Sequence, residues 1–246
     1  VTDKSISLIN DWVKEKTNGK IPSIVSDKNS DFLAMLVNAV YFKGAWQNDF
    51  SKSATEDGVF TDRNGKENTV SFMHDTAWRQ VSQKDGVTIT TLPYKTSDGK
   101  NSSNLDVSMY LLMSDKAFNA EKELSAAKFD SVYTALSMPK FRIEYSAGMS
   151  DMLKKIGINK AFTDTADLSS MLTGSDRTLI SDVIHKTYID VDEEGTEAAA
   201  VTGVSVGATS LPPTPTEINY NKPFTFVIKD NTSGDILFMG EYAFAE

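Results

Sequence analysis

The sequence predicts an α+β protein in which β-sheet dominates. Apolar residues recur at helical spacing near the start of the chain, at Ile6, Ile9, Trp12 and Val13. Most of the chain beyond this segment has the pattern of strands joined by turns. No internal repeat or long linker divides the 246 residues, so we expect a single domain spanning 1–246.

The first helix and the first strand follow from local pattern. The helix is expected to end at Asn18-Gly19, with Pro22 just beyond. The apolar run 32–42 shows no alternation, which predicts a central strand covered on both faces, although a short buried helix has the same pattern.

The rest of the chain is predicted as strands with one further helix. Strands are expected within 57–113, with turns at Asn64-Gly65 and Asp98-Gly99. A helix face follows at Met149, Met152, Leu153 and Ile156, and Gly157 closes that helix. Strand patterns return at 179–191, 224–228 and 235–242, and the last two flank a turn at 231–234.

Composition and charge exclude several functions. Asp and Glu number 34 against 25 Lys and Arg, and the net charge of -9 disfavours binding to nucleic acid or anionic lipid. The chain has no cysteine, which removes disulfides, thiolate nucleophiles and Cys-ligated metals. The apolar run 32–42 is shorter than the ~20 residues of a membrane span. We expect no nucleic-acid partner and no membrane span, and the first residues contain no signal segment.

The sequence gives little support for a catalytic histidine. His74 and His185 are the only histidines, so a Ser-His-Asp triad would need one of them. His185 lies inside the strand pattern 183–191, where a hydrogen-bonded core histidine is the simpler interpretation. His74 is interpreted as a strand-edge or loop residue.

Phosphate and metal motifs are incomplete. Residues 195–210 contain several glycines but not the Gly-Lys-Ser/Thr of a P-loop. Residues 190–195 resemble the start of a calcium loop, but Val201 stands where that loop requires a bidentate Glu. We therefore predict no catalytic residue, no metal and no cofactor.

Residues 193–216 form the most unusual segment of the chain. The alternate positions of its first part are all small and uncharged: Thr196, Ala198, Ala200, Thr202, Val204, Val206 and Ala208. One face of an extended chain could therefore be buried in a sheet, and no proline interrupts 195–209. A flexible surface loop is the alternative interpretation of such a stretch.

Several segments of the chain match one known protein family. Residues 180–186 are followed by 191–200, which read Val-Asp-Glu-Glu-Gly-Thr-Glu-Ala-Ala-Ala, and together they closely resemble the hinge region of the serpins, a family of serine protease inhibitors. Further matches, in family order, are 9–13, 17–20, 36–46, 138–141, 157–162, 221–226 and 237–240. The chain resembles a bacterial-type serpin without cysteine.

This resemblance implies a serpin-like fold with large mixed β-sheets and packed helices. Serpins place several helices and strands before the helix that opens this chain. The chain therefore resembles the C-terminal two thirds of a serpin, with the N-terminal helices and strands missing, and a separate N-terminal serpin fragment is an expected partner.

The function implied is suicide inhibition of a serine protease. The protease cuts the exposed reactive loop, about 193–216, and forms an acyl-enzyme; the freed loop then inserts as a strand into the main sheet and traps the protease. Loop insertion in serpins is an established example of strand addition. The resemblance assigns the hinge of this loop to Glu193, Glu194, Gly195, Thr196, Glu197, Ala198, Ala199 and Ala200.

Three further positions are implied in opening the sheet. In the family, the positions matched by Asn38 and His185 meet beneath the opening, and each is expected to be the other's hydrogen-bond partner. Trp46 matches a tryptophan at the top of the sheet, where the loop first enters.

The loop also implies a target and a location. Alignment of the loop places the cut between Thr209 and Ser210, and 195–216 contains no Lys, Arg or aromatic residue. A trypsin-like pocket needs Lys or Arg, and a small residue leaves a chymotrypsin-like pocket half empty. We expect an elastase-like or subtilisin-like serine protease as the partner, and an extracellular or cell-surface inhibitor.

Two alternatives to inhibition remain open. A non-inhibitory serpin with a carrier, chaperone or storage role is one, and an enzyme is a more remote one. We also expect part of 195–209 to be ordered as a strand, inserted in its own sheet or in that of another molecule.

Overall fold

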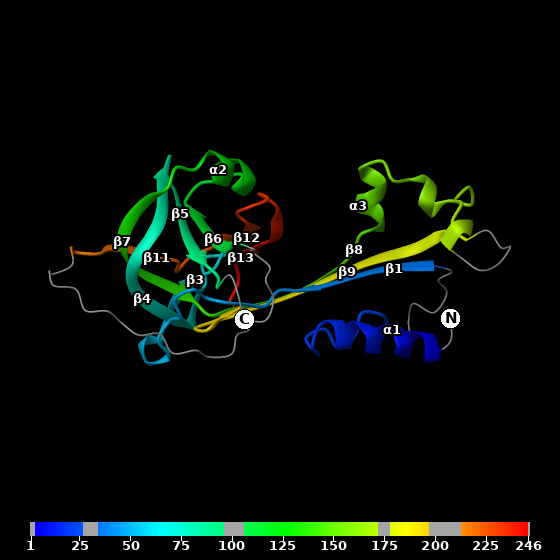
Figure 1. The fold of residues 1–246 in the computed structure, drawn as a ribbon, viewed down its shortest axis with the longest axis horizontal. Coiled ribbons are helices and arrows are strands. Elements are labelled where there is room, and N and C mark those ends of the chain that lie inside the picture. The colour runs from blue at the N-terminus through cyan, green and yellow to red at the C-terminus, as the bar shows by residue number, and fades with distance from the viewer. Residues whose placement is uncertain (1–2, 27–33, 96–105, 172–177, 197–212, 246) are drawn as a thin grey trace. The chain divides into compact units, whose positions relative to one another are not determined.

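A computed structural model describes residues 3–26, 34–95, 106–171, 178–196 and 213–245 (Figure 1). The chain forms two compact units. The first contains Val1–Phe42 and Arg142–Ile189, and the second contains Lys43–Phe141 and Asp190–Glu246. The expectation of one continuous domain stays a prediction.

Helix α1, Asp3–Lys16, opens the first unit and confirms the helix predicted there. It ends where the sequence indicates, because Asn18 and Gly19 adopt positive φ angles of 50° and 81°. Trp12 departs from the predicted buried face, since half of it is exposed.

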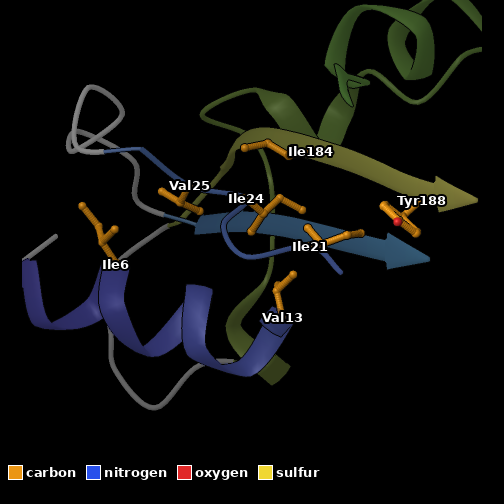
Figure 2. Close-up of a cluster of buried hydrophobic side chains, with 7 residues drawn as sticks. All are labelled: Ile6, Val13, Ile21, Ile24, Val25, Ile184 and Tyr188. Carbon is orange, nitrogen blue, oxygen red and sulfur yellow. The ribbon is translucent and has the colours of Figure 1, made fainter. Parts of the chain in front are cut away.

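The core of the first unit joins α1 to the segment after it and to strand β9 (Figure 2). Seven buried side chains form it: Ile6, Val13, Ile21, Ile24, Val25, Ile184 and Tyr188. The amide of Asn10 holds the connecting segment, because its Oδ1 accepts hydrogen bonds from the backbone N–H groups of Ile24 and Val25 and its Nδ2 donates to the Val25 carbonyl. These bonds satisfy backbone groups that no sheet or helix pairs.

Strands β1, Ala34–Tyr41, and β9, Ile180–Asp192, run parallel and pair directly in the first unit (Figure 1). Strand β8, Phe141–Gly148, also pairs with β9. The odd-numbered residues of β1 pack against the α1 core, whereas Leu36 and Asn38 are exposed. The prediction that both faces of this strand are covered is therefore wrong for the part of the chain that the structure describes.

The remaining elements of the first unit follow β8. They are α3 (Ser150–Lys155) and two short 3₁₀ turns, η3 (Lys160–Phe162) and η4 (Ser169–Met171). Gly157, with a φ of 104°, ends α3 as predicted. Met152 and Ile156 are mostly exposed, so the apolar face predicted for this helix is not a buried one among the described residues.

The second unit is built on an eight-stranded sheet. Its strands are β3 (Glu56–Thr61), β4 (Glu67–Lys84), β5 (Val87–Pro93), β6 (Val107–Ser114), β7 (Asp130–Pro139), β11 (Thr216–Asn219), β12 (Phe224–Asp230) and β13 (Ile236–Tyr242). They lie in the order β11-β7-β4-β5-β6-β12-β13, and β3 pairs with β4. Strand β2 is Gly44–Ala45, η2 is Lys52–Ala54 and α2 is Ala120–Ala126.

This sheet confirms the strands predicted for 57–113 and 224–242. The predicted turns are also present where they are described, because Gly65 and Gly234 have φ angles of 80° and 85°. The predicted turn at Asp98-Gly99 lies outside the described residues. The core contains an aromatic group in which Phe141 packs within 5.7 Å, between ring centroids, of Phe224, Phe226 and Tyr242.

Candidate functional site: the hinge of the loop

The start of the unusual segment forms a short hairpin in the second unit. Strand β9 ends at Asp192, Glu193 and Glu194 make the turn, and β10, Gly195–Thr196, returns antiparallel to β9. On its other side β10 pairs with β2, so it lies between β9 and β2. Only two residues, Phe42 and Lys43, separate β2 from the end of β1. Along β9, the pairing with β10 begins at Val191, three residues beyond Tyr188, the last residue that pairs with β1.

Gly195 is the residue that lets the hairpin turn back so closely. Its φ of 139° lies in a region that side chains disfavour. A Cβ there would also lie 2.2 Å from the carbonyl oxygen of Gly44 and 2.8 Å from the Cα of Ala45. Both neighbours are backbone atoms and cannot rotate away, so this position requires glycine.

Trp46 holds the turn from the side of β2. Its side chain is 1% exposed, and its Nε1 donates a 2.9 Å hydrogen bond to the carbonyl of Asp192. Its backbone N–H donates to the carbonyl of Glu194, and that of Phe50 donates to the carbonyl of Glu193. Three consecutive carbonyls of the turn are thereby fixed, and the expected place of Trp46, where the loop first enters the sheet, stays a prediction.

Tyr94 extends this contact to the first loop residue. Its ring stacks on Trp46 with centroids 4.6 Å apart and an interplanar angle of 15°. Its hydroxyl lies 2.8 Å from the Oγ1 of Thr196, which is fully buried. Burial raises the pKa of Tyr94 far above its ordinary value, so its hydroxyl stays protonated and can act as donor or acceptor at any physiological pH.

Glu193 is buried and held by two side chains. Its Oε2 accepts a 2.8 Å bond from the Nζ of Lys140 and its Oε1 a 2.7 Å bond from the Oγ1 of Thr55. Burial by itself would raise the pKa of Glu193, but the bonds from Lys140 and Thr55 outweigh it and hold the pKa below its usual range. The carboxylate is thus ionised and fixed at neutral pH.

The two acidic neighbours of Glu193 behave differently. Glu194 pairs with Lys52 at the surface, and this bond raises the pKa of Lys52. Burial raises the pKa of Asp192, although the backbone N–H of Glu194 donates to its carboxylate and partly offsets the rise. The turn therefore concentrates three carboxylates of which Glu193 is the most firmly bound.

The structure brings Asn38 and His185 together only in part. They are direct Cα partners in the β1–β9 pair, as the resemblance implies. Asn38 is exposed and His185 half-buried, and no hydrogen bond joins these two described side chains. The expectation that each is the other's buried hydrogen-bond partner is therefore wrong in this structure, because the face of β1 that carries Asn38 is uncovered within the described residues.

The remaining predicted positions can be assigned only in part. Glu197, Ala198, Ala199, Ala200, Thr209 and Ser210 lie outside the described residues, and they stay predictions. The prediction of an ordered, inserted strand is confirmed for Gly195–Thr196. Strands β1 and β9 pair directly from Ala34↔Ile180 to Tyr41↔Tyr188.

Sequence reasoning missed Tyr94, Lys140 and Thr55. Lys140 stands in the Met-Pro-Lys-Phe match at 138–141, which was assigned no role, and a single basic residue before a strand is a weak signal. Tyr94 follows the predicted strand 87–92 directly, and only the isolated pairing of Trp46 with Tyr94 reveals its place.

Comparison with known proteins identifies the class. A family model described as serpin (serine protease inhibitor) matches residues 2–243. Serpin-Z2A of Triticum aestivum is 34% identical over 94% of this chain and 62% of its own length, and the leukocyte elastase inhibitor of Bos taurus is 35% identical over 94% and 64%. The chain thus spans less than two thirds of the length of these relatives.

A solved structure agrees with these sequences. The thermophilic serpin tengpin in its native state superposes with a TM-score of 0.81 at 31% identity, over 99% of this chain and 64% of its own. The fold and these matches together define the class of the protein. The chain belongs to the serpin family. In the part of the chain that the structure describes, no helix has the length and apolarity needed to cross a membrane.

Proposed function

We propose that the protein inhibits a serine protease by the suicide mechanism, with residues about 193–216 as the reactive loop. The observation that carries this proposal is the seating of β10 between β9 and β2, because insertion along β9 would continue from the pair Thr196↔Val191. Thr196 is fully buried in that rung, as an inserting residue must be.

The register of this rung supports insertion along β9. Continued antiparallel pairing would set Ala198 opposite Ile189 and Ala200 opposite Thr187. At present β1 pairs with β9 from Ile180 to Tyr188. Strands β1 and β9 would therefore have to separate before the loop could pair with these residues. Because β9 extends back to Ile180, it can accept most of 195–209, a strand of about 50 Å at ~3.3 Å per residue.

The residues that would enter are suited to burial. Thr196, Ala198 and Ala200 would share one face of the sheet with His185, and none carries a charge. A serpin whose loop does not insert has no need of such a face. This pattern therefore favours the inhibitor over the non-inhibitory alternative.

We further propose Thr209-Ser210 as the bond that is cut and an elastase-like or subtilisin-like protease as the target. The support is the absence of Lys, Arg and aromatic residues from 195–216 and the similarity to a leukocyte elastase inhibitor. Incubation of the full-length protein with elastase, subtilisin, trypsin and chymotrypsin is expected to give a denaturant-resistant complex with the first two, and a released peptide that begins at Ser210. A dominant complex with trypsin, or cleavage of the loop by all four without a complex, would contradict the proposal.

The insertion register can be tested by cross-linking, because the chain has no cysteine. Directly opposed residues of antiparallel strands have Cα atoms about 4.5–5.5 Å apart, within disulfide range. The double variant Ala200→Cys/Thr187→Cys is expected to form a disulfide only after the loop is cut. The matched control Ala199→Cys/Thr187→Cys, with its first cysteine on the other face, is expected not to. Equal cross-linking of the two would refute the register.

A further inference from the structure

Two aromatic side chains form a pair on the outer face of the large sheet in the second unit. Trp78 of β4 and Tyr133 of β7 are direct Cα partners, and their ring centroids lie 5.5 Å apart. Trp78 is 60% exposed, whereas Arg79, the next residue of the strand, is buried. Side chains alternate between the two faces of a strand, so Trp78 and Tyr133 lie on the face opposite to Arg79. We call these two residues the aromatic pair.

The residues around the aromatic pair are polar. Gln80 and Ser131 are Cα partners on the same face, as are Thr76 and Ala135. Gln80, Ser131 and Thr76 are all exposed. On the neighbouring strand β11, the exposed Glu217 is the partner of Ala135. Two rings surrounded by polar side chains have the composition of a protein interface, in which Trp and Tyr are enriched among the residues that contribute most to binding.

The aromatic pair lies where the chain re-enters this sheet after the proposed reactive loop. Strand β11 runs parallel to β7, beside it in the sheet, and its first residue, Thr216, is the Cα partner of Thr134 (Figure 1). Tyr133 directly precedes Thr134 in β7. Because the two strands are parallel, residues 213–215 approach the sheet on the side of Tyr133. The aromatic pair is therefore next to the C-terminal stem of the loop.

A protease bound to the loop is held close to the aromatic pair. Ser210, which follows the bond proposed to be cut, precedes Thr216 by six residues, and these span at most ~22 Å. A globular domain of roughly 250 residues has a radius of gyration of about 18 Å. A protease whose active site holds this bond is thus near enough and large enough for its surface beside the active site to contact the two rings.

We propose that Trp78 and Tyr133 form a second docking surface for the target protease, outside the protease active site. The proposal rests on the proposed function, because the loop brings the protease to this face. Residues 195–216 contain no Lys, Arg or aromatic residue, so the loop gives the active site little to bind. Contact with the aromatic pair supplies affinity that the loop lacks.

The chemistry of this face defines the partner surface that fits it. The two rings require an apolar patch on the protease. The exposed carboxylate of Glu217 and the net charge of -9 favour a patch bordered by Lys or Arg. Glu217→Gln is therefore expected to slow association about 2-fold or more at low salt, and the difference is expected to disappear at high salt. An unchanged rate at low salt would exclude the basic border.

Docking can be measured without cleavage. Subtilisin and elastase, each with its catalytic serine replaced by alanine, serve as probes for binding to the full-length protein. Trp78→Ala is expected to weaken binding about 10-fold or more, whereas Trp78→Phe, which keeps a ring, is expected to weaken it less than about 3-fold. Trp12→Ala removes a similarly exposed tryptophan from α1 and is the matched control. Absence of binding to both probes, unchanged binding in Trp78→Ala, or an equal loss in the control overturns the proposal.

Cleavage of the loop by the active proteases separates the docking surface from the proposed function. Trp78→Ala is expected to slow cleavage by about as much as it weakens docking. Cleavage that depends on Trp78 but ends in release of the protease would confirm the docking surface and refute the inhibitor. A protease complex that forms as fast in Trp78→Ala as in the unsubstituted protein would confirm the inhibitor and overturn the docking surface.

A second copy of the chain is the alternative occupant of this face. Sedimentation of the unsubstituted protein and of Trp78→Ala is expected to give the same oligomeric state, because the proposed partner is the protease. A dimer that Trp78→Ala dissociates, with docking of the protease unchanged, would assign the face to self-association and overturn the proposal.

Discussion

The carboxylate of Glu193 should control how readily the hinge opens. Its side chain is 5% exposed, and Lys140 and Thr55 both donate to it. The variant Glu193→Gln keeps the shape but loses the charge, and its amide can accept from only one of the two donors. A hydrogen bond to a charged group contributes about 1.5–3 kcal/mol.

The expected loss is smaller than that range, because the Lys140 side chain is 38% exposed and can be hydrated when the pair is broken. We expect a cost of about 1–2 kcal/mol, which corresponds to a roughly 5- to 30-fold increase in hinge opening. Hydrogen exchange reports this opening at the amides of Trp46 and Phe50, which donate to the carbonyls of Glu194 and Glu193.

The matched control is Glu194→Gln, one residue along the same turn. Lys52, the partner of Glu194, is 68% exposed, and surface pairs of this kind contribute little. Exchange at Trp46 and Phe50 should change less than about 2-fold in this control. The reasoning fails if the two variants accelerate exchange equally, or if Glu193→Gln leaves it unchanged.

The same carboxylate predicts a pH effect in the unsubstituted protein. Because the pKa of Glu193 is lowered on folding, its contribution to stability is present above the ordinary value of 4.5 and is lost as pH falls through the lower, folded value. In Glu193→Gln the stability should fall less steeply below pH 4.5. Urea unfolding of both proteins across this range measures the difference, and parallel curves would contradict the assignment.

Three further predictions concern Gly195, Thr196 and Tyr94. Gly195→Ala should lower the free energy of unfolding by about 2 kcal/mol or more, because the residue has a φ of 139° and the added Cβ would lie 2.2 Å from the carbonyl oxygen of Gly44. A change below about 0.5 kcal/mol in urea unfolding would show that the turn is not as described. Thr196→Arg should convert the inhibitor into a substrate that is cut and released, because an unpaired cation cannot enter this buried rung; undiminished complex formation on gels would exclude insertion through this face. Stability should fall as pH rises above 10, by about 1.4 kcal/mol per pH unit for each tyrosine kept neutral by burial, and Tyr94→Phe should reduce this slope in alkaline urea unfolding; an unchanged slope would mean that Tyr94 ionises freely in the folded protein.

The sequence pattern predicted the secondary structure well, because the residues that end a helix or make a turn act on their immediate neighbours in the chain. The positive φ angles of Asn18, Gly19 and Gly157 end the helices at the residues that the sequence indicates. Burial was harder to predict, since it depends on what covers each face. Leu36 and Asn38 lie on a face of β1 that nothing covers among the described residues, although their apolar context indicated a buried strand.

The hinge shows the same division between what local sequence can and cannot reveal. The resemblance to the serpins assigned the hinge, whereas the small, uncharged residues after Glu194 indicated only that one face of an extended chain could be buried. Lys140 and Tyr94, which hold that turn, come from segments more than 50 residues away in the sequence. No periodicity links such distant positions. Trp46 shows why this matters, since one indole fixes the Asp192 carbonyl and stacks on Tyr94, so any change that shifts this ring must also act on the hinge.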